Sequence, residues 1–339
     1  MSVVIIKRGL LDTIQDEGRF GFQHLGINTG GSMDLAAARV ANMLVGNKTT
    51  EAVIELHFPA ASFRFQKNCL IALSGADFYP AINNDLVPLN TAIIASESSV
   101  LKFNQYRKGC RCYLAVHGGW DAELWLSSYT TNIRASAGGY KGRALKKEDV
   151  IEIHPALDGT QFIPPGTKQN SNSKILPVTI NIDHLYDQAK KIRCVTGNEY
   201  DGLDEDSKNK FQSSSFTITS QSDRMGYRLV GEMLRNVKDQ QLLSSAVSRG
   251  TIQLLPSGEL IILMADHQTT GGYPKIAHVI SADFPKLAQM HPNEHLEFEF
   301  IIHTAAEEAF IEQQQFLQLT EDSIKLQLQQ YFDDDIDRS

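Results

Sequence analysis

Short apolar runs recur along the sequence, separated by glycine, proline, asparagine and aspartate. Runs of this kind, rich in Val, Ile, Leu and Phe and bounded by turn residues, predict β-strands joined by tight connections. The predicted strands span residues 3–6, 52–56, 62–65, 70–74, 92–95, 100–103, 112–116, 150–153, 192–195, 215–219, 251–255, 260–264, 277–280 and 296–301. Because few helical runs lie between them, the pattern favours barrels or sandwiches over alternating β-α units.

Two segments carry helical signals. Asp34 precedes the run LAAARVANMLVG, where its carboxylate is placed to cap a helix that Gly46 ends. A second helix is predicted over about residues 305–331, where apolar residues recur in a partly amphipathic pattern among many Gln and Glu.

The length of the chain, 339 residues, suggests about two domains of ordinary size. Residues 155–177 are rich in Gly, Pro, Ser and Asn and poor in periodic apolar positions, which is typical of a linker. We therefore predict a β-rich N-terminal domain over residues 1–165, a β-rich C-terminal domain over 176–304 and a C-terminal helix over 305–332.

Composition and charge exclude several classes of protein. The net charge of −8 argues against a nucleic-acid binder. No apolar stretch approaches the ~18 to 20 residues of a membrane span. The short apolar run before Lys7 and Arg8 has the reverse order of a signal peptide. We therefore expect a soluble protein of the cytoplasm.

The cysteines show no paired metal-ligand spacing; they are Cys69, Cys110, Cys112 and Cys194. Cys110 and Cys112 would share one face of a strand, where they are poorly placed to bridge each other. Reduced core thiols are the preferred interpretation, and a redox role is the alternative.

The familiar catalytic signatures are absent from the sequence. It has no phosphate-loop lysine, no dinucleotide fingerprint, no nucleophile elbow and no paired-histidine zinc motif. His291 and His295 are close in sequence, but the Pro-Asn turn between them suits no rigid metal site, and no metal is predicted. Any chemistry must therefore be assembled from distant segments.

Four glycine-rich segments with charged or amide side chains are the candidate sites, because glycine lets the backbone approach a ligand. The first runs from Asp16 and Arg19 to Asp34, and taken alone it is better explained as a pair of turns and a helix cap.

The second segment joins HGG to the loop SAGGYKGRALKK. Its glycines expose backbone amides, and Lys141 and Arg143 add positive charge, which favours binding of a carboxylate or phosphate. An exposed basic hairpin is the alternative.

The third segment is SDRMGYRL, in which Asp223 is expected to pair with Arg224, so that Arg224 or Arg228 engages a carboxylate. A structural salt bridge explains the same residues. The fourth, MADHQTTGGYPKIA, follows an apolar strand and predicts a polar pocket floor closed by a tight turn.

The early stretch QDEGRFGFQ also resembles QSDRMGYRL from Gln221. Duplication of a barrel and chance similarity both remain open explanations.

Taken in order, these segments resemble the family variously called KipA, allophanate hydrolase subunit 2-like or biotin-dependent carboxyltransferase-like, whose bacterial members include the C subunit of 5-oxoprolinase. The matching stretches, between about residues 8 and 302, are LLDTIQDEGRFGFQHLGINTGGSMD, ARVANMLVGN, YLAVHGG, GGYKGRAL, SDRMGYRL, GTIQLLPSGELIILMADHQTTGGYP and DFPKLAQ.

The resemblance implies a mostly β fold of two β-barrel-like (cyclophilin-like) domains with a cleft between them, similar to the carboxyltransferase domain of urea carboxylase. It also implies a partner subunit related to KipI. In the 5-oxoprolinase system a third subunit of the LamB/YcsF type joins this pair, and together they open 5-oxoproline to glutamate using ATP. ATP is thus expected at the level of the complex, and no covalent biotin is expected on this chain.

Site roles follow as hypotheses for a small anionic or amide substrate. Catalytic roles, such as orienting water or the amide, are predicted for Asp223, Arg224, Asp266 and Gln268. Substrate binding is predicted for Asp16, Arg19, Asp34, His117, Gly118, Gly119, Gly138, Gly139, Arg143, Thr269, Thr270, Gly271, Gly272 and Tyr273.

The sequence departs from the family pattern at several turns. Phe58 replaces the glycine of a usual Gly-Pro, and Leu126 and Ser127 stand at a usual glycine-serine turn. Glu148 precedes Asp149 where Gly-Asp is usual, and Asn293 replaces a turn glycine. Loss of a glycine at Ser127, near a ligand loop, suggests a narrower pocket and a different substrate.

The leading functional hypothesis is a 5-oxoprolinase subunit that hydrolyses a cyclic amide, driven by ATP, within a complex. The first alternative is the carboxyltransferase of a urea carboxylase or allophanate-type amidolyase system. The second is a KipI-binding regulator of a sporulation-type kinase inhibitor. The enzyme subunit and the regulator use the same partner, so the sequence does not separate them.

Overall fold

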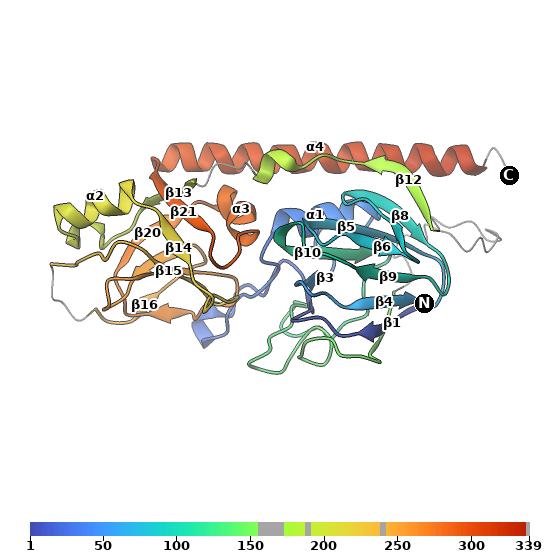
Figure 1. The fold of residues 1–339 in the computed structure, drawn as a ribbon, viewed down its shortest axis with the longest axis horizontal. Helices are drawn as coiled ribbons and strands as arrows, with labels where there is room; N and C mark the ends of the chain where they lie inside the picture. Colours follow the sequence, from blue (N-terminus) through green and yellow to red (C-terminus); the bar gives the residue numbers. More distant parts are fainter. Residues whose placement is uncertain (155–172, 187–190, 238–241, 337–339) are drawn as a thin grey trace. The chain divides into compact units, whose positions relative to one another are not determined.

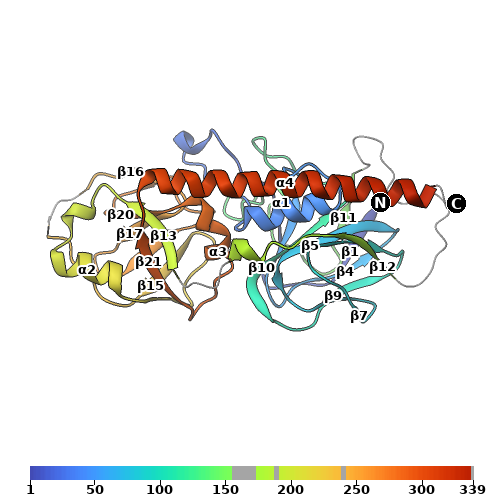
Figure 2. The ribbon, with the colours of Figure 1, turned by 90° about the horizontal axis from the view of Figure 1, so that it is seen from above.

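The chain crosses four times between two structural units. The computed structural model describes residues 1–154, 173–186, 191–237 and 242–336. Unit 1 comprises Met1–Gly18, Asp34–Ile182 and Phe316–Ser339, and unit 2 comprises Arg19–Met33 and Asp183–Gln315. The elements of each unit are labelled in Figure 1 and Figure 2.

Unit 1 contains two six-stranded sheets built from the short strands of the first half of the chain (Figure 1). The first has the order β11 (Val150–Glu152), β1 (Ser2–Lys7), β4 (Ser62–Phe65), β9 (Val100–Phe103), β6 (Pro80–Ile82) and β7 (Asp85–Leu86). The second has the order β12 (Lys174–Thr179), β8 (Thr91–Ala95), β5 (Cys69–Asp77), β10 (Lys108–Val116), β3 (Val53–Leu56) and β2 (Thr13–Gln15). Residues of both sheets, such as Phe63 and Ile71, join one apolar core.

The second sheet is covered on its other face by α1 (Leu35–Leu44), which packs on β5 and β10 (Figure 2). Asp34 caps this helix, because its Oδ1 accepts the N–H of Ala37 at 3.0 Å. Gly46, with φ +69°, follows the last turn. Both predictions for this helix are confirmed.

Unit 2 is built around a closed seven-stranded barrel. Its strands are, in order, β13 (Lys191–Thr196), β20 (Lys275–Val279), β17 (Thr251–Leu254), β18 (Leu260–Leu263), β15 (Gly226–Val230), β14 (Phe216–Ile218) and β21 (His295–Phe300). β13 pairs with β21 in parallel, and the other neighbours in the barrel are antiparallel. The core includes Phe211 of α2 (Glu205–Ser213), which stacks on Phe298 with ring centroids 4.6 Å apart.

Smaller elements surround the barrel. β16 (Ser245–Ala246) and β19 (Thr270–Gly271) form a separate two-stranded sheet. The remaining short helices are α3 (Phe284–Ala288), η1 (Gln23–Leu25), η2 (Asp183–Tyr186), η3 (Tyr200–Gly202) and η4 (Ser281–Asp283).

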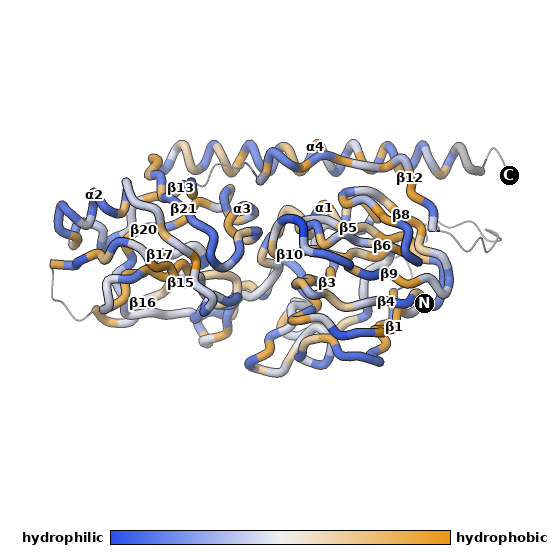
Figure 3. Tube along the Cα trace, viewed as in Figure 1, coloured by the Kyte–Doolittle hydropathy of each residue, from blue (hydrophilic) through white to orange (hydrophobic). Residues whose placement is uncertain are grey.

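The last element, α4 (His303–Ile336), is one helix that contributes to both units. Within unit 2, Gln313 Nε2 donates to the carbonyl oxygen of Ala282 at 3.0 Å, and within unit 1 the N–H of Thr179 donates to Gln327 Oε1 at 3.3 Å. Figure 3 shows apolar and polar residues alternating along α4, which agrees with the partly amphipathic pattern of the sequence. Among the described helices, none combines the length and the apolar character that a bilayer crossing needs.

The strand predictions are largely confirmed. Each predicted strand corresponds to an observed one, whereas β2, β6, β7, β12, β15, β16 and β19 were not predicted. Residues 155–172 of the predicted linker lie outside the described residues, and its end is wrong, because residues 174–177 belong to β12, which pairs with β8. The cysteines are free thiols, as predicted, and three of them are buried as expected for core residues, whereas Cys110 is half-buried.

Several turns hold residues other than glycine in the left-handed region of the backbone. The φ angles are +51° at Leu126, +61° at Ser127, +72° at Glu148 and +72° at Asn293. The Cβ of most L-residues crowds the following carbonyl oxygen there, at a cost of roughly 1–2 kcal/mol, and Asn tolerates this region better. Among them, Ser127, Glu148 and Asn293 are positions where the family resemblance implies glycine.

Replacing Glu148 by glycine should therefore stabilise the protein. We expect the free energy of unfolding in urea to rise by about 0.5 to 1 kcal/mol, because relief of backbone strain exceeds the added freedom of the unfolded chain. The N–H of residue 148 keeps its hydrogen bond to the carbonyl oxygen of Ile5 at 2.8 Å. The exposed ion pair of Glu148 with Lys147, at 3.4 Å, contributes little.

The matched control is Glu148→Ala, which removes the charge and keeps the Cβ. Its free energy of unfolding should stay near that of the unaltered protein. An equal gain in both variants would show that charge, and not the backbone, is responsible.

Candidate functional site

A buried arginine lies at the centre of the polar residues of unit 2. Arg224 is 5% exposed, and it donates to both carboxylate oxygens of Asp266, from Nε to Oδ2 at 2.8 Å and from Nη2 to Oδ1 at 3.0 Å. Nη2 also donates to the carbonyl oxygen of Gly31 at 2.7 Å. This bidentate pairing fixes the planes of both groups. We call Arg224, Asp266, Gly31, Arg249 and His267 the Arg224 cluster.

The register of two barrel strands brings Arg224 and Asp266 together. β15 and β18 are antiparallel with Gly226 opposite Leu263, so the start of β15 lies beside the end of β18. The pairing continues beyond the strands, where the N–H of Asp266 donates to the carbonyl oxygen of Arg224 at 2.8 Å. The two side chains are therefore neighbours although 42 positions separate them.

Arg249 and His267 complete the cluster. Arg249 donates to the carbonyl oxygens of Ser32, at 3.2 Å, and Met33, and its guanidinium lies 4.6 Å from the ring centroid of Phe284. His267 is buried, with Nδ1 2.5 Å from the carbonyl oxygen of Gln268. Burial and the nearby charge of Arg249 lower the pKa of His267. His267 is therefore a neutral imidazole that donates from Nδ1 and leaves Nε2 as an acceptor.

The predicted ion pair between Asp223 and Arg224 is wrong. Asp223 Oδ1 accepts the N–H groups of Met225 at 2.7 Å and Gly226 at 3.2 Å, and so closes the turn before β15. The Asp16 carboxylate likewise accepts the N–H of the residue two places further on, at 2.8 Å. The two halves of the short sequence repeat thus share turn chemistry, while duplication of a barrel stays a prediction.

The other predicted residues of the fourth segment follow Asp266 on a loop and on β19. They are Gln268, Thr269, Thr270, Gly271, Gly272 and Tyr273. A Cβ on Gly271 would lie 2.6 Å from Gln253 Nε2, so a larger residue there would require the end of the Gln253 side chain to move. Gln268 and Tyr273 are exposed, the latter by 44%, which leaves both side chains accessible to a ligand.

In unit 1, the carboxylate of Asp16 holds a loop in place. Oδ1 accepts the hydroxyl groups of Ser128 at 2.8 Å and Thr130 at 2.6 Å, and Oδ2 accepts the N–H of Tyr129 at 2.6 Å. Asp16 is buried, and these donors replace the water that the charge loses. Contact between Asp16 and a substrate stays a prediction.

The predicted anion-binding loop contains a paired arginine. Arg143 Nη1 and Nη2 donate to the two carboxylate oxygens of Asp149, each at 2.7 Å, and these hydrogen bonds raise the pKa of the guanidinium. Gly138 and Gly139 make the tight turn with φ +71° and +60°. Because Asp149 occupies the fork of Arg143, anion binding here would depend on the exposed Lys141.

The remaining glycines of the second segment lie at the end of β10. His117 Nδ1 lies 2.8 Å from the carbonyl oxygen of Val45, and the N–H of Gly118 donates to Asn47 Oδ1 at 2.9 Å. Gly119 follows with φ +85°. These contacts join β10 to the C-terminal end of α1.

Arg19 and Asp34 lie in different units although both belong to the first segment. Arg19 is buried in unit 2, where its N–H donates to the carbonyl oxygen of Thr29 at 2.7 Å. Asp34 is fully buried in unit 1 as the cap of α1. The structure thus supports the helix-cap explanation of Asp34, and its role in substrate binding stays a prediction.

A second buried polar cluster, in unit 1, was missed by the sequence analysis. Glu55 is fully buried, and its Oε2 accepts the hydroxyl of Tyr113 at 2.8 Å, while Tyr113 Oη accepts the N–H of Asp34 at 2.7 Å. His57 Nε2 and Arg111 Nε each lie 4.0 Å from Glu55 Oε1. We call Glu55, Tyr113, Asp34, His57 and Arg111 the Glu55 cluster.

Strand alternation explains the Glu55 cluster. Ile54 and Leu56 belong to the apolar core, so Glu55 between them points to the face that carries α1. Tyr113 lies opposite Glu55 in the β3–β10 pairing. The signal in the sequence is the single acidic residue within the apolar run AVIEL. Burial and the charge of Glu55 raise the pKa of Tyr113 well above its ordinary value, so Tyr113 remains a neutral donor.

Asp12 lies next to this cluster. Its Oδ1 accepts the N–H of His57 at 3.0 Å, and its Oδ2 accepts the N–H of Ala61 at 2.7 Å. Burial raises the pKa of Asp12 to about 7, the two N–H groups oppose that rise, and the charge of Glu55 adds to it. Asp12 therefore titrates near neutral pH.

Chemically, the Arg224 cluster joins a buried cation, a carboxylate that reaches solvent and a neutral imidazole. The side chain of Asp266 is 25% exposed, whereas that of Arg224 is 6% exposed. The guanidinium of Arg224 fixes the orientation of this carboxylate, which is therefore able to orient a water molecule or an amide N–H. Within the described ranges, no three His, Cys, Asp or Glu residues lie close enough to hold a metal ion.

The fold and these polar clusters define a mostly β protein with two units, one of them a closed barrel. The profile of the family described as "Carboxyltransferase domain, subdomain A and B" matches residues 25–300. The chain belongs to this family.

Relatives with assigned names narrow the comparison. The chain is 35% identical to the C subunit of 5-oxoprolinase from Escherichia coli (strain K12) over 286 residues, which cover 84% of this chain and 87% of that protein. It is also 35% identical to the C subunit of 5-oxoprolinase from Haemophilus influenzae over 289 residues, covering 85% and 88%.

A solved structure shows the same fold. The crystal structure of the K. lactis urea amidolyase superposes with a TM-score of 0.83 at 23% identity, covering 94% of this chain and 20% of that one. The match supports the mostly β architecture expected from the carboxyltransferase domain of urea carboxylase, and the chain spans about a fifth of that larger protein.

Removal of the Asp266 charge should destabilise unit 2 because it leaves Arg224 buried without its carboxylate. We expect Asp266→Asn to lower the free energy of unfolding in urea by about 2 to 3 kcal/mol. Asp223→Asn is the matched control, since an amide oxygen still accepts the N–H groups of the turn, and it should cost less than about 0.5 kcal/mol. Equal losses in the two variants would contradict the assignment of Asp266 as the partner of Arg224.

The raised pKa of Asp12 makes stability depend on pH. Between pH 3.8 and about 7 the unfolded chain has lost the Asp12 proton and the folded chain keeps it. The contribution of Asp12 to the free energy of unfolding therefore falls as pH rises through that window. Asp12→Asn abolishes the effect, and its stability relative to the unaltered protein should improve by about 2 to 3 kcal/mol between about pH 5 and pH 8.

Urea denaturation of both proteins across this pH range measures the difference directly. At any single pH, the stability difference between the two proteins also includes the effect of the altered hydrogen bonds of the amide. That effect does not change with pH, so only the change of the difference with pH reports the titration of Asp12. A stability difference that stays constant with pH would contradict the titration of Asp12 in this range.

Proposed function

We propose that the chain is the C subunit of an ATP-dependent 5-oxoprolinase of the cytoplasm, which opens 5-oxoproline to L-glutamate together with a KipI-like and a LamB/YcsF-like subunit. The observation that carries this proposal is the 35% identity to two proteins of that name, over nearly the full length of each. Their designation as a subunit supports the inference that this chain works in a complex and not alone.

The reaction is hydrolysis of a stable cyclic amide. One water oxygen bonds to the ring carbonyl carbon, the C–N bond breaks, and the nitrogen takes up protons to become the amino group of glutamate. ATP supplies the driving force at the level of the complex. The N-terminus of α1 does not fit a nucleotide phosphate, because the carboxylate of Asp34 already caps it. ATP is therefore assigned to the complex as a whole and not to the N-terminus of α1.

Within this chain, we assign the handling of the amide and of water to the exposed side of the Arg224 cluster. Asp266 reaches solvent with its carboxylate fixed by Arg224, and Gln268 follows it on an exposed loop. A lactam ring carries an N–H donor and a carbonyl acceptor. A carboxylate accepts from such an N–H, and the primary amide of a glutamine donates to such a carbonyl oxygen. Asp223 supports this role through the turn that places Arg224.

The proposal predicts that activity needs all of the subunits. Co-expression of the chain with the KipI-like and LamB/YcsF-like subunits should yield ATP-dependent formation of glutamate from 5-oxoproline, and omission of any one subunit should abolish it. Glutamate formation by this chain alone would refute the requirement for partners. Stable assembly of the three subunits without turnover would instead favour a role in binding and regulation.

Gln268→Ala in the assembled complex tests the site. The side chain is exposed, so the fold should be unaffected, and loss of a positioned amide should lower kcat by at least about tenfold. Gln315→Ala, an exposed glutamine of α4, is the matched control and should leave turnover unchanged. Equal activity of the two variants would remove Gln268 from the site.

A second candidate, carboxyl transfer from carboxybiotin to urea or a related amide, is supported by the family description and by the fold shared with the K. lactis urea amidolyase. The sequence has no biotin attachment motif, so the carrier would be part of another protein. Incubation of the purified chain with carboxybiotin and urea, followed by assay of allophanate, distinguishes this reaction from lactam hydrolysis.

A further inference from the structure

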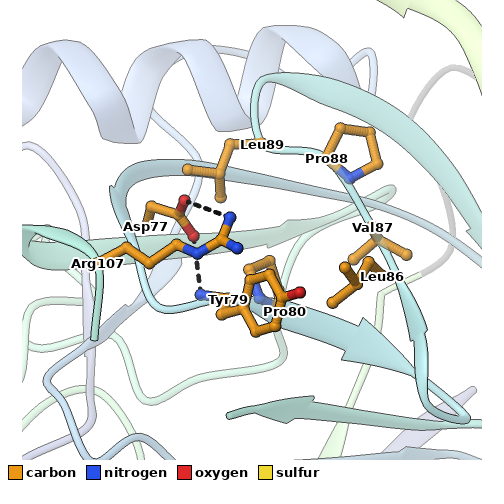
Figure 4. Close-up of a pocket in the computed structure, with 8 residues that line it drawn as sticks. All are labelled: Asp77, Tyr79, Pro80, Leu86, Val87, Pro88, Leu89 and Arg107. Carbon is orange, nitrogen blue, oxygen red and sulfur yellow. Dashed lines mark hydrogen bonds and ion pairs between the residues drawn. The ribbon is translucent and has the colours of Figure 1, made fainter. Parts of the chain in front are cut away.

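A small cavity of about 240 Å³ opens in unit 1, apart from the residues of both clusters. Figure 4 shows the side chains that surround it. They are Asp77, Tyr79, Pro80, Leu86, Val87, Pro88, Leu89 and Arg107. One wall is therefore aliphatic, and the other carries one acid, one arginine and one aromatic ring.

Arg107 is held flat and keeps its donors available. Its guanidinium carbon lies 3.7 Å from the ring centroid of Tyr79, and Nη1 forms an ion pair with Asp77 Oδ2 at 3.7 Å, a distance too long for a hydrogen bond (Figure 4). The Arg107 side chain is 50% exposed and donates no hydrogen bond to the part of the chain that the structure describes. Stacking on the ring orders the guanidinium in advance, which lowers the entropic cost of binding a carboxylate.

The backbone below Arg107 is strained and tightly held. Tyr79 has φ +54°, unusual for a bulky residue. Its N–H donates to Asp77 Oδ1 at 2.8 Å, and its carbonyl oxygen accepts the N–H and the Nδ2 of Asn104, both at 3.3 Å. Strained residues that the surrounding structure holds in this way cluster at ligand sites.

The strand next to Arg107 is irregular as well. β10 pairs with β5 at Lys108 opposite Asp77, and the register then shifts before Cys112. Such irregularities bend a strand and redirect nearby side chains, and they are frequent beside binding sites. The bend lies directly after Arg107, where β10 begins.

The charges on the wall define the ligand. Arg107 suits a carboxylate, but Asp77 close beside it would repel a bare anion or a phosphate dianion. Asp77 Oδ2, by contrast, is able to accept a nearby N–H, since only Oδ1 receives the N–H of Tyr79. The aliphatic wall of Leu86, Val87 and Leu89 suits a branched apolar group.

We propose that this cavity binds a carboxylate that carries an adjacent N–H and a compact aliphatic side chain, the chemistry of an aliphatic α-amino acid. The carboxylate pairs with Arg107, the N–H donates to Asp77, and the side chain packs on Leu86, Val87 and Leu89. The ligand is either the free amino acid or the C-terminal residue of a peptide. This site shares no residue with the proposed lactam site. The outcome of the binding test below is therefore independent of the 5-oxoprolinase proposal.

Titration of the full chain, labelled at its Leu and Val methyl groups, with L-leucine tests the site by NMR. The methyl signals of Leu86, Val87 and Leu89 should shift at ligand concentrations up to about 10 mM. Isovalerate, which lacks the N–H, and isoamylamine, which lacks the carboxylate, should each bind at least about fivefold more weakly. N-acetyl-alanyl-leucine separates the two sources, because it binds more tightly than L-leucine only if the natural ligand is a chain terminus.

Arg107→Gln should weaken L-leucine binding at least about fivefold, and Arg107→Lys, which keeps the charge without the planar fork, should give an intermediate loss. Arg64→Gln, at an exposed arginine of β4 outside the cavity, should bind as the unaltered protein does. Unchanged methyl signals elsewhere in unit 1 establish that each variant is folded. The proposal is overturned by an absence of shifts at the three residues, by equal effects of the Arg107 and Arg64 variants, or by equal binding of the three small probes.

Discussion

Both units depend on charged side chains that are removed from water and supplied with partners from the chain itself. A buried charge costs free energy unless hydrogen bonds replace its hydration. In unit 1 the carboxylate of Asp16 receives hydroxyl and backbone donors and that of Glu55 a phenol, and in unit 2 the buried guanidinium of Arg224 donates to Asp266. Each of these groups joins segments that are far apart in the sequence. The polar loops therefore keep one geometry, because loss of a partner would leave a buried charge unsatisfied.

Features that depend on neighbours in sequence were predictable, and those that depend on strand pairing were not. Asp34 caps α1 through a residue three positions away, and the apolar runs that became strands carry their own signal. The partner of Arg224 is not the adjacent Asp223 but Asp266, which only the β15–β18 register brings near. The Glu55 cluster likewise requires the pairing of β3 with β10. β12 was mistaken for a linker because its ladder with β8, and not its composition, makes it a strand.

Membership of the carboxyltransferase family accounts for the order of the glycine-rich segments, and the structure shows how one of them serves both units. The first segment leaves unit 1 after Gly18 and returns at Asp34. Between these points it supplies the carbonyl oxygen of Gly31 to Arg224 in unit 2, and at its end Asp34 begins α1 in unit 1. Glycine is thus needed at position 31, where the backbone has φ +93° and its carbonyl oxygen accepts the hydrogen bond from Arg224.

The parallel pairing of β13 with β21 closes the barrel of unit 2 and leaves its seven strands without an edge. A strand from another chain has no unpaired ladder to join there, whereas each sheet of unit 1 ends in a strand with one open side. Strand addition by a partner is therefore open to the sheets of unit 1 and to the small β16–β19 sheet of unit 2, but not to the folded barrel. The short β7 and β11 at the ends of the first sheet of unit 1, two and three residues long, offer little backbone for such addition.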